Sequence, residues 1–168
     1  GKTSLMTTFA CNKFFAENTP TVFESCTVQL PVKENCFAQI LPCDTSGKRE
    51  YCKLRTLYYD HDTHVFMVCY AIDNPLSLKR VQENWVHEIE HQCPFAIKML
   101  VGCKKDLRKD SEQNIVTYNE GFEMATRLKF HAFVETSAMN MENLKEMNLM
   151  AVFLANSKES KQNKCVIM

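Results

Sequence analysis

Glycine is scarce in this chain of 168 residues: it occurs four times, whereas average usage of roughly 7% would give about twelve. Such a shortage argues against a long glycine-rich loop that cradles phosphates. An excess of charge of one sign is also missing, because twenty Lys and Arg balance twenty Asp and Glu. A net charge of zero removes the usual electrostatic argument for binding nucleic acid or an anionic surface, so we expect no nucleic-acid partner.

Paired cysteines and long apolar runs are lacking too. The nine cysteines are an odd number and include no C-x-x-C pair, which disfavours a disulfide framework or a zinc ribbon and favours reduced thiols in the cytosol. No apolar run approaches the length of about 18 residues that a membrane span needs. Because the chain starts at Gly1 without a charged and apolar leader, we expect no signal peptide and expect residues to be missing upstream.

Short apolar runs alternate with helical patterns along the chain. Residues 65–72 and 97–101 are nearly continuous apolar runs, typical of strands buried on both faces of a parallel sheet. The other expected elements are strands over residues 26–32, 36–41 and 131–135 and helices over residues 3–12, 76–92, 120–128 and 141–154. This order predicts a doubly wound α/β domain over residues 1–156, followed by a flexible polar tail over residues 157–168.

The chain opens on a phosphate-binding pattern. Gly1-Lys2-Thr3-Ser4 matches the end of G-x-x-x-x-G-K-[ST] at the start of the first expected helix. A helix N-terminus offers unpaired N–H groups, a Lys adds a charge for phosphate oxygens, and a Thr hydroxyl can bind Mg²⁺. Alone the pattern is weak support, because average composition produces it in roughly one chain of this size in twelve.

Three further motifs follow expected strands. Asp44-Thr45-Ser46-Gly47 provides a carboxylate that can hold a Mg²⁺ water and a Gly N–H that can approach a γ-phosphate. Cys103-Lys104-Lys105-Asp106 provides an Asp that can accept hydrogen bonds from guanine, and Glu135-Thr136-Ser137-Ala138 follows the last strand. Each motif alone is compatible with an ordinary loop. Their common place after strands, in this order, is not explained by ordinary loops.

These motifs, with several other segments, resemble the Rho branch of the Ras-like small GTPases over essentially the whole chain. The other segments are Thr19-Pro20-Thr21-Val22-Phe23-Glu24, Leu54-Arg55-Thr56-Leu57-Tyr58-Tyr59, Trp85 with its helix, Val101-Gly102 with Leu107-Arg108, and Cys165-Val166-Ile167-Met168. The resemblance implies a small G domain with a P-loop NTPase-type, mostly parallel sheet that lacks the family's first strand. It also implies a switch that binds GTP or GDP with Mg²⁺ and hydrolyses GTP in signalling to the actin cytoskeleton and cell polarity.

Carried over residue by residue, the resemblance implies roles for named side chains. Nucleotide contacts would fall to Gly1, Lys2, Thr3, Ser4, Phe14, Thr21, Asp44, Gly47, Lys104, Asp106, Ser137 and Ala138. Of these, Thr3 and Thr21 would bind Mg²⁺ directly and Asp44 through water, while Phe14 fits a place in the core equally well. Effectors would dock on Val22, Phe23 and Glu24. Exchange factors, GTPase-activating proteins and dissociation inhibitors are implied as regulators.

Several positions depart from the family pattern. Lys48 stands where the family has the Gln that orients the attacking water, and a Lys ammonium has donors but no acceptor for that water. Together with Ser46 this is similar to the Rnd subgroup, which stays bound to GTP, so we expect weak hydrolysis; the alternative is that Lys48 is an exposed side chain without kinetic effect. Pro42, Cys103 and Met139 also depart, which keeps open a nucleotide-free pseudo-GTPase that binds effectors or regulators.

A motif of another class lies at His87-Glu88-Ile89-Glu90-His91, which fits the zinc pattern H-E-x-x-H. No third ligand is evident downstream. Trp85 and Ile89 are expected to face the core, which leaves both histidines on a solvated face. Zinc proteolysis is therefore the minor alternative.

The last four residues, Cys165-Val166-Ile167-Met168, fit the prenylation pattern C-a-a-X with the Met that favours a farnesyl group. Three Lys against one Glu between residues 158 and 164 add about two net positive charges, a weak second membrane signal. We predict a lipid on Cys165 and reversible attachment to the cytoplasmic face of a membrane, first of all the plasma membrane. An unmodified flexible tail is the alternative.

Overall fold

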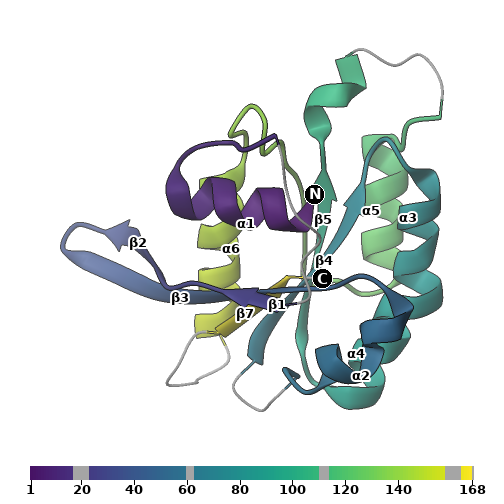
Figure 1. The fold of residues 1–168 in the computed structure, drawn as a ribbon, viewed down its shortest axis with the longest axis horizontal. Coiled ribbons are helices and arrows are strands. Elements are labelled where there is room, and N and C mark those ends of the chain that lie inside the picture. Colours follow the sequence, from purple (N-terminus) through teal and green to yellow (C-terminus); the bar gives the residue numbers. More distant parts are fainter. Residues whose placement is uncertain (17–22, 60–62, 110–113, 158–163, 168) are drawn as a thin grey trace.

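A single mixed sheet with helices on both faces organises the chain in a computed structural model that describes residues 1–16, 23–59, 63–109, 114–157 and 164–167 (Figure 1). The strands are β1 (Phe23–Ser25), β2 (Val28–Lys33), β3 (Cys36–Thr45), β4 (Thr63–Ala71), β5 (Ile97–Cys103), β6 (Ala132–Glu135) and β7 (Lys164–Ile167). The helices are α1 (Lys2–Cys11), α2 (Cys52–Thr56), α3 (Pro75–Arg80), α4 (Val86–Gln92), α5 (Tyr118–Arg127) and α6 (Leu144–Asn156). Arg49–Tyr51 and Lys105–Lys109 form 3-10 turns, and the π-helical segment Val81–Trp85 joins α3 to α4.

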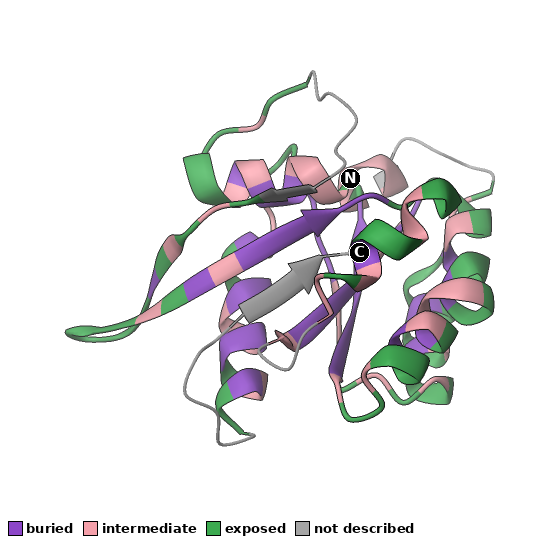
Figure 2. Cartoon of the chain, turned by 60° about the horizontal axis from the view of Figure 1, so that its bottom comes forward, coloured by how far each residue is buried: buried purple, intermediate pink, exposed green. Residues whose placement is uncertain are grey.

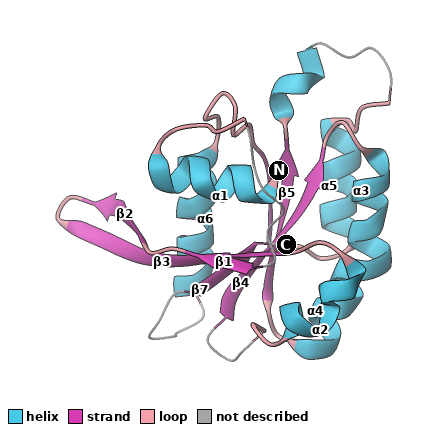
Figure 3. Cartoon of the chain, in the orientation of Figure 1, coloured by secondary structure: helices cyan, strands magenta, loops and turns pink. Residues whose placement is uncertain are grey.

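The strand order is β1-β3-β7-β4-β5-β6, with β2 folded back on the outer part of β3 as a long hairpin (Figure 3). The strands from β3 through β7, β4 and β5 to β6 run parallel, whereas β1 and β2 are antiparallel to β3. Parallel neighbours need crossover connections, and the helices between β4, β5 and β6 provide them. The α/β class with a mostly parallel sheet is therefore confirmed.

Two hydrophobic cores lie on opposite faces of the sheet. Successive strand residues point to opposite faces, so Val65 and Met67 of β4 pack in the core with α1 and α6, while Phe66 and Val68 pack with α3 and α4 on the other face. All four side chains are buried, and Figure 2 colours the described strands in the middle of the sheet mostly as buried. A strand buried on both faces explains why residues 65–72 read as one continuous apolar run.

Side-chain caps fix where two helices begin. Asn74 accepts a hydrogen bond from the Ser77 N–H at 3.3 Å, and Pro75 occupies the first turn of α3. At α5, Thr117 accepts from the Glu120 N–H at 3.2 Å, while the Glu120 carboxylate accepts from the Thr117 N–H at 2.7 Å. Both arrangements satisfy N–H groups that the first helical turn leaves unpaired.

Most expected elements are present, with ends displaced by a few residues. The helix expected over residues 76–92 is divided by its π-helical segment. Strand β3 continues past residue 41 to Thr45, with Pro42 inside it, although a proline cannot donate to a strand ladder. The short elements β1 and α2 were not expected. Among the described residues, no helix has the length and apolarity needed to cross a membrane.

The largest difference from expectation is strand β7. The sequence predicts a flexible tail over residues 157–168, whereas Lys164–Ile167 pair in the middle of the sheet, parallel to β3 and to β4. Cys165 is in register with Pro42 on one side and with Val65 on the other. Four residues are too few for a periodicity signal, and they pair with two strands that lie far away in the sequence.

Candidate functional site

The predicted motifs meet at one edge of the sheet, where β3, β5 and β6 end and α1 begins (Figure 1). Parallel strands bring their carboxyl ends to the same edge, and the loops there are the usual place for ligands in open α/β sheets. Two adjoining hollows lie at this edge. One contains the residues expected to contact phosphates, and the other contains those expected to contact the base.

The phosphate-side cavity has a volume of about 170 Å³ and is lined by Lys2, Thr3 and the five residues 44–48. The Thr3 hydroxyl donates a hydrogen bond to the Asp44 carboxylate, which is fully buried. The Lys2 ammonium lies 3.3 Å from the place that a Cβ on Gly47 would occupy, so the glycine permits this close approach. A hydroxyl and a carboxylate are oxygen ligands of the kind that Mg²⁺ takes, and the residues present therefore fit this cation.

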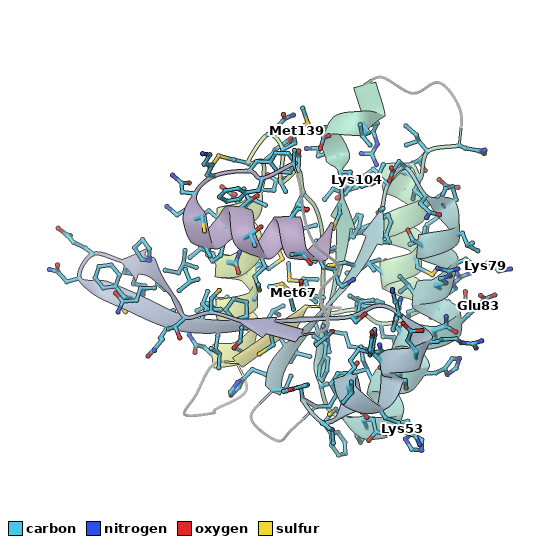
Figure 4. The ribbon with its side chains drawn as sticks, viewed as in Figure 1. Lys53, Met67, Lys79, Glu83, Lys104 and Met139 are labelled. Atoms are coloured by element: carbon cyan, nitrogen blue, oxygen red, sulfur yellow. The ribbon has the colours of Figure 1, made fainter. Side chains whose placement is uncertain are left out.

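The base-side cavity has a volume of about 160 Å³ and contains six of the predicted nucleotide residues. These are Gly1, Ser4, Phe14, Lys104, Asp106 and Ala138. Cys103 and Met139 line the same cavity, and Figure 4 shows Lys104 and Met139 at this end of the molecule. Phe14 is half-buried at the wall of the cavity, so its ring is placed where it can contact a base.

Hydrogen bonds hold the two loops of the base-side cavity together. The Ser137 hydroxyl donates to Asp106 and accepts from the Asn140 N–H at 3.0 Å. The Lys105 N–H donates to the Thr136 carbonyl at 3.0 Å, which joins the loop after β5 to the loop after β6. Lys104 has a left-handed φ of 65°. The Asp106 carboxylate, an acceptor suited to the N–H groups of guanine, is thus held in a fixed position.

Cys103 is a buried residue in the lining of the base-side cavity. It is buried at the end of β5, and a Cβ on Gly1 would lie 3.0 Å from the Cys103 Cβ, so the start of α1 packs directly on it. The neighbouring Cys69 thiol lowers the pKa of Cys103 against the opposing effect of burial, and the charge of Lys2 adds to the lowering. The same contact raises the pKa of Cys69. Cys103, although it departs from the family pattern, therefore packs closely against the start of α1.

Comparisons with known proteins agree with this geometry. A model of the Ras family matches residues 1–156. The chain is also similar to the GTP-binding protein rho1 of Schizosaccharomyces pombe (strain 972 / ATCC 24843), with 35% identity over 156 residues that cover 88% of this chain and 76% of that protein. The chain is a Rho-type small GTPase of the Ras family. Proteins of this family generally bind GTP or GDP with Mg²⁺ and hydrolyse GTP, and the fit of the two cavities agrees with that chemistry.

Parts of the predicted GTPase site fall outside the described residues. Thr21 and Val22 are among these, so their predicted Mg²⁺ and effector roles stay predictions. Phe23 and Glu24 begin β1, where their backbones are in register with Thr45 and Asp44 of β3. The end of the expected effector segment therefore lies beside the strand that carries the predicted Mg²⁺ residue.

A buried ion pair that sequence reasoning missed anchors the segment after Gly47. The guanidinium of Arg55, in α2, donates two hydrogen bonds of 2.7 Å to the Glu88 carboxylate in α4, and a further bond of 2.6 Å to the Ser46 carbonyl. The Tyr59 hydroxyl donates to Glu88 at 2.7 Å. Arg55 also lies over the Trp85 ring, 4.9 Å from its centroid. We refer to Arg55, Tyr59, Trp85 and Glu88 as the α2–α4 anchor.

The electrostatics of the α2–α4 anchor favour its charged form. Burial alone would raise the pKa of Glu88, but hydrogen bonds from Arg55 and Tyr59 bring it below its ordinary value. Burial and the bond to the Glu88 carboxylate together raise the pKa of Tyr59, so its hydroxyl stays a donor. Acidification through the folded-state pKa of Glu88 therefore removes the stability that the ion pair contributes above the unfolded-state pKa.

The H-E-x-x-H motif has a structural explanation in this anchor. Its Glu88 is the carboxylate bound by Arg55, and Ile89 is buried, whereas His87 and His91 are exposed. Glu90 pairs with Lys98 at the start of β5. Glu88, which a zinc protease would use as its general base, is therefore bound to Arg55 and holds α2 against α4.

Proposed function

We propose that this GTPase is a guanine-nucleotide switch that hydrolyses GTP slowly. In this proposal Asp106 and the Ala138 backbone recognise guanine, Phe14 and the Lys104 stem contact the base, and Lys2 contacts phosphate oxygens. Thr3, Thr21 and Asp44 would hold Mg²⁺, which neutralises phosphate charge when bound. The support is that all of these residues except Thr21, which lies outside the described residues, converge on two cavities at the sheet edge.

The proposed slow hydrolysis rests on Lys48. Its main chain is fixed, because its N–H donates to the Ser46 hydroxyl at 3.4 Å and its carbonyl accepts from Arg55 at 3.3 Å. Its side chain is 61% exposed and lies 3.7 Å from the Glu50 carboxylate at the rim of the phosphate-side cavity. At this rim a Gln carbonyl can accept a hydrogen bond from a water, whereas an ammonium offers only donors.

Single-turnover hydrolysis of GTP tests this role. Lys48→Gln restores an acceptor, and we expect it to hydrolyse GTP about tenfold faster than the unchanged protein or more. Lys48→Met is the matched control, because it removes the charge without adding an acceptor and should stay as slow as the unchanged protein. Equal rates for Lys48→Gln and the unchanged protein would contradict the proposal.

A second candidate is a nucleotide-free pseudo-GTPase that binds effectors or regulators. It is favoured by polar groups of the site that are engaged with each other: Thr3 with Asp44, Ser137 with Asp106, and Lys104 with Asp73 at 2.8 Å. Mass spectrometry of nucleotide released from the purified protein separates the candidates. Bound GTP supports the slow switch, bound GDP supports ordinary cycling, and no nucleotide supports the pseudo-GTPase.

We further propose that the GTPase acts in signalling to the actin cytoskeleton or cell polarity from the cytoplasmic face of a membrane. The resemblance to the Rho branch supports effector docking on Val22, Phe23 and Glu24 and regulation by exchange factors, GTPase-activating proteins and dissociation inhibitors. A lipid on Cys165 would attach the protein reversibly to the membrane, the plasma membrane first of all. Cell fractionation tests the attachment: Cys165→Ser should move the protein to the soluble fraction.

A further inference from the structure

The 3-10 turn Lys105–Lys109 carries a second charged side chain besides the predicted guanine acceptor Asp106. The Arg108 guanidinium makes a two-bond contact with the Glu135 carboxylate: one nitrogen donates to Oε2, and the other donates to Oε1 at 2.6 Å. The second nitrogen also donates to the Val116 carbonyl at 2.9 Å. The Glu135 side chain is 2% exposed and that of Arg108 is 30% exposed, so the ion pair is largely buried.

Glu135 is held in place by the sheet. It is the last residue of β6 and is in register with Gly102 of β5, where a Cβ on the glycine would lie 3.1 Å from the Glu135 Cγ. Its carbonyl accepts from the Asn143 side chain at 2.8 Å, and the following N–H, of Thr136, donates to the Gly102 carbonyl at 2.7 Å. Arg108 is therefore bound to a carboxylate whose position the paired strands fix.

The surroundings favour the charged form of the pair. The hydrogen bonds to Glu135 raise the pKa of Arg108 against the opposing effect of burial. Burial and the charge of Glu135 raise the pKa of Tyr70, so its buried hydroxyl stays protonated. A carboxylate as buried as that of Glu135 is unfavourable without a cation, which ties the turn that carries Arg108 to the end of β6.

The ion pair joins the two loops that are expected to contact guanine. Arg108 follows Asp106 by two residues, and Glu135 precedes Ser137 and Ala138 by two and three residues. Asp106 and Ala138 line the base-side cavity, whereas neither member of the pair is among the described residues that line it. The pair can therefore act on a bound base only through these loops. A bidentate arginine–carboxylate contact restricts both distance and angle, as an acceptor aimed at two donors requires.

We propose that Arg108 and Glu135 are positioning residues for guanine recognition, and that their ion pair fixes the Asp106 carboxylate relative to the loop after β6. The proposal rests on the guanine recognition by Asp106 that the proposed function includes. A carboxylate in this place accepts one hydrogen bond from the guanine N1–H and one from the 2-amino group. Hypoxanthine lacks the 2-amino group. The preference for guanine over hypoxanthine therefore measures how well Asp106 is aligned with both donors.

The test titrates the full chain, after removal of bound nucleotide, with GDP and with inosine diphosphate. We expect the unchanged protein to bind GDP about tenfold more tightly than inosine diphosphate, as one hydrogen bond to a charged acceptor provides. Arg108→Met keeps an unbranched stem and removes the guanidinium, and we expect it to bind GDP more weakly, with a ratio of about twofold. A role in stability alone would leave the ratio of the two affinities unchanged.

Two further variants at the pair keep the test decisive. Arg108→Lys retains a cation but not the planar fork, so its ratio should lie between those of the unchanged protein and Arg108→Met. Arg108→Met combined with Glu135→Gln leaves no buried charge unpaired, so this protein should fold even where the single variant does not. Its ratio should also be about twofold.

Arg127→Met is the matched control. This exposed arginine of α5 donates to the Gln82 side chain at 2.8 Å and is not among the described residues that line either nucleotide cavity. It should keep the ratio of the unchanged protein. A tenfold ratio in the combined variant, or an equal loss of preference in Arg127→Met, would overturn the proposal. An unchanged protein that does not prefer GDP would overturn guanine recognition by Asp106, and this role of Arg108 and Glu135 with it.

Discussion

The nucleotide cavities and the α2–α4 anchor both border Lys48 and differ in what their charged side chains contact. In the cavities, Asp106 and Lys2 line hollows of about 160 and 170 Å³. In the anchor, Arg55 is 4% exposed, with bonds to Glu88, Ser46 and Lys48 and a ring beneath it. Open space borders the anchor as well, since Arg55, Trp85 and Glu88 line a hollow of about 1120 Å³, but the polar groups of the anchor are bonded to one another. Changes in the cavities should therefore alter binding, and changes in the anchor should alter stability.

Arg55→Ala should give the largest effect and should act on stability. It leaves the Glu88 carboxylate, whose side chain is only 16% exposed, without its cationic partner, and we expect the free energy of unfolding to fall by about 3 kcal/mol. Urea unfolding followed by fluorescence of Trp85, the single tryptophan, measures the loss. Lys53→Ala is the matched control, because Lys53 is an exposed residue of the same helix (Figure 4). A loss below about 1 kcal/mol would show that the ion pair contributes no more to the free energy of unfolding than an exposed surface pair does.

Asp106→Ala should act on nucleotide affinity with little change in stability. A charged acceptor contributes about 2 kcal/mol to a buried hydrogen bond, so we expect GDP affinity to fall about thirtyfold. Titration with a fluorescent GDP analogue measures this change. Asp73→Ala, which removes only the partly exposed partner of Lys104, should lower affinity less than fivefold. Unchanged affinity in Asp106→Ala would contradict guanine recognition by Asp106, whereas no measurable GDP binding by the unchanged protein would favour the pseudo-GTPase.

The two regions also differ in how far the sequence predicts them. Asp44, Asp106 and Ser137 were identified because each follows an apolar run, and parallel strands bring such positions to one edge of the sheet. The Arg55–Glu88 pair joins residues 33 positions apart, and neither has a pattern that indicates its partner. Glu88 instead suggested a zinc motif. The available signal for a buried ion pair was the position of Glu88, which directly precedes the buried Ile89 in a helix that packs on the core.

Strand β7 was missed for a third reason. Lys164–Ile167 carry strand-forming residues, but a segment of four residues has no period that separates a strand from a tail. Its place depends on two edges contributed by β3 and β4, about 100 to 120 residues earlier in the chain. The start of α3 and both ends of α5, where side-chain caps act locally, were predicted to within a few residues.

Tyr59→Phe should give the smallest effect, and it separates the contribution of the Tyr59 hydroxyl from that of the Arg55–Glu88 ion pair. The change removes the 2.7 Å hydrogen bond to Glu88 and keeps the ring, whose edge-on contact with Phe66 spans 4.9 Å between centroids. We expect the free energy of unfolding to fall by about 1 kcal/mol. Tyr51→Phe is the control, because it removes a hydroxyl that makes no hydrogen bond to any described residue. If Tyr59→Phe equals Arg55→Ala in urea unfolding, the hydroxyl and not the ion pair holds α2 against α4.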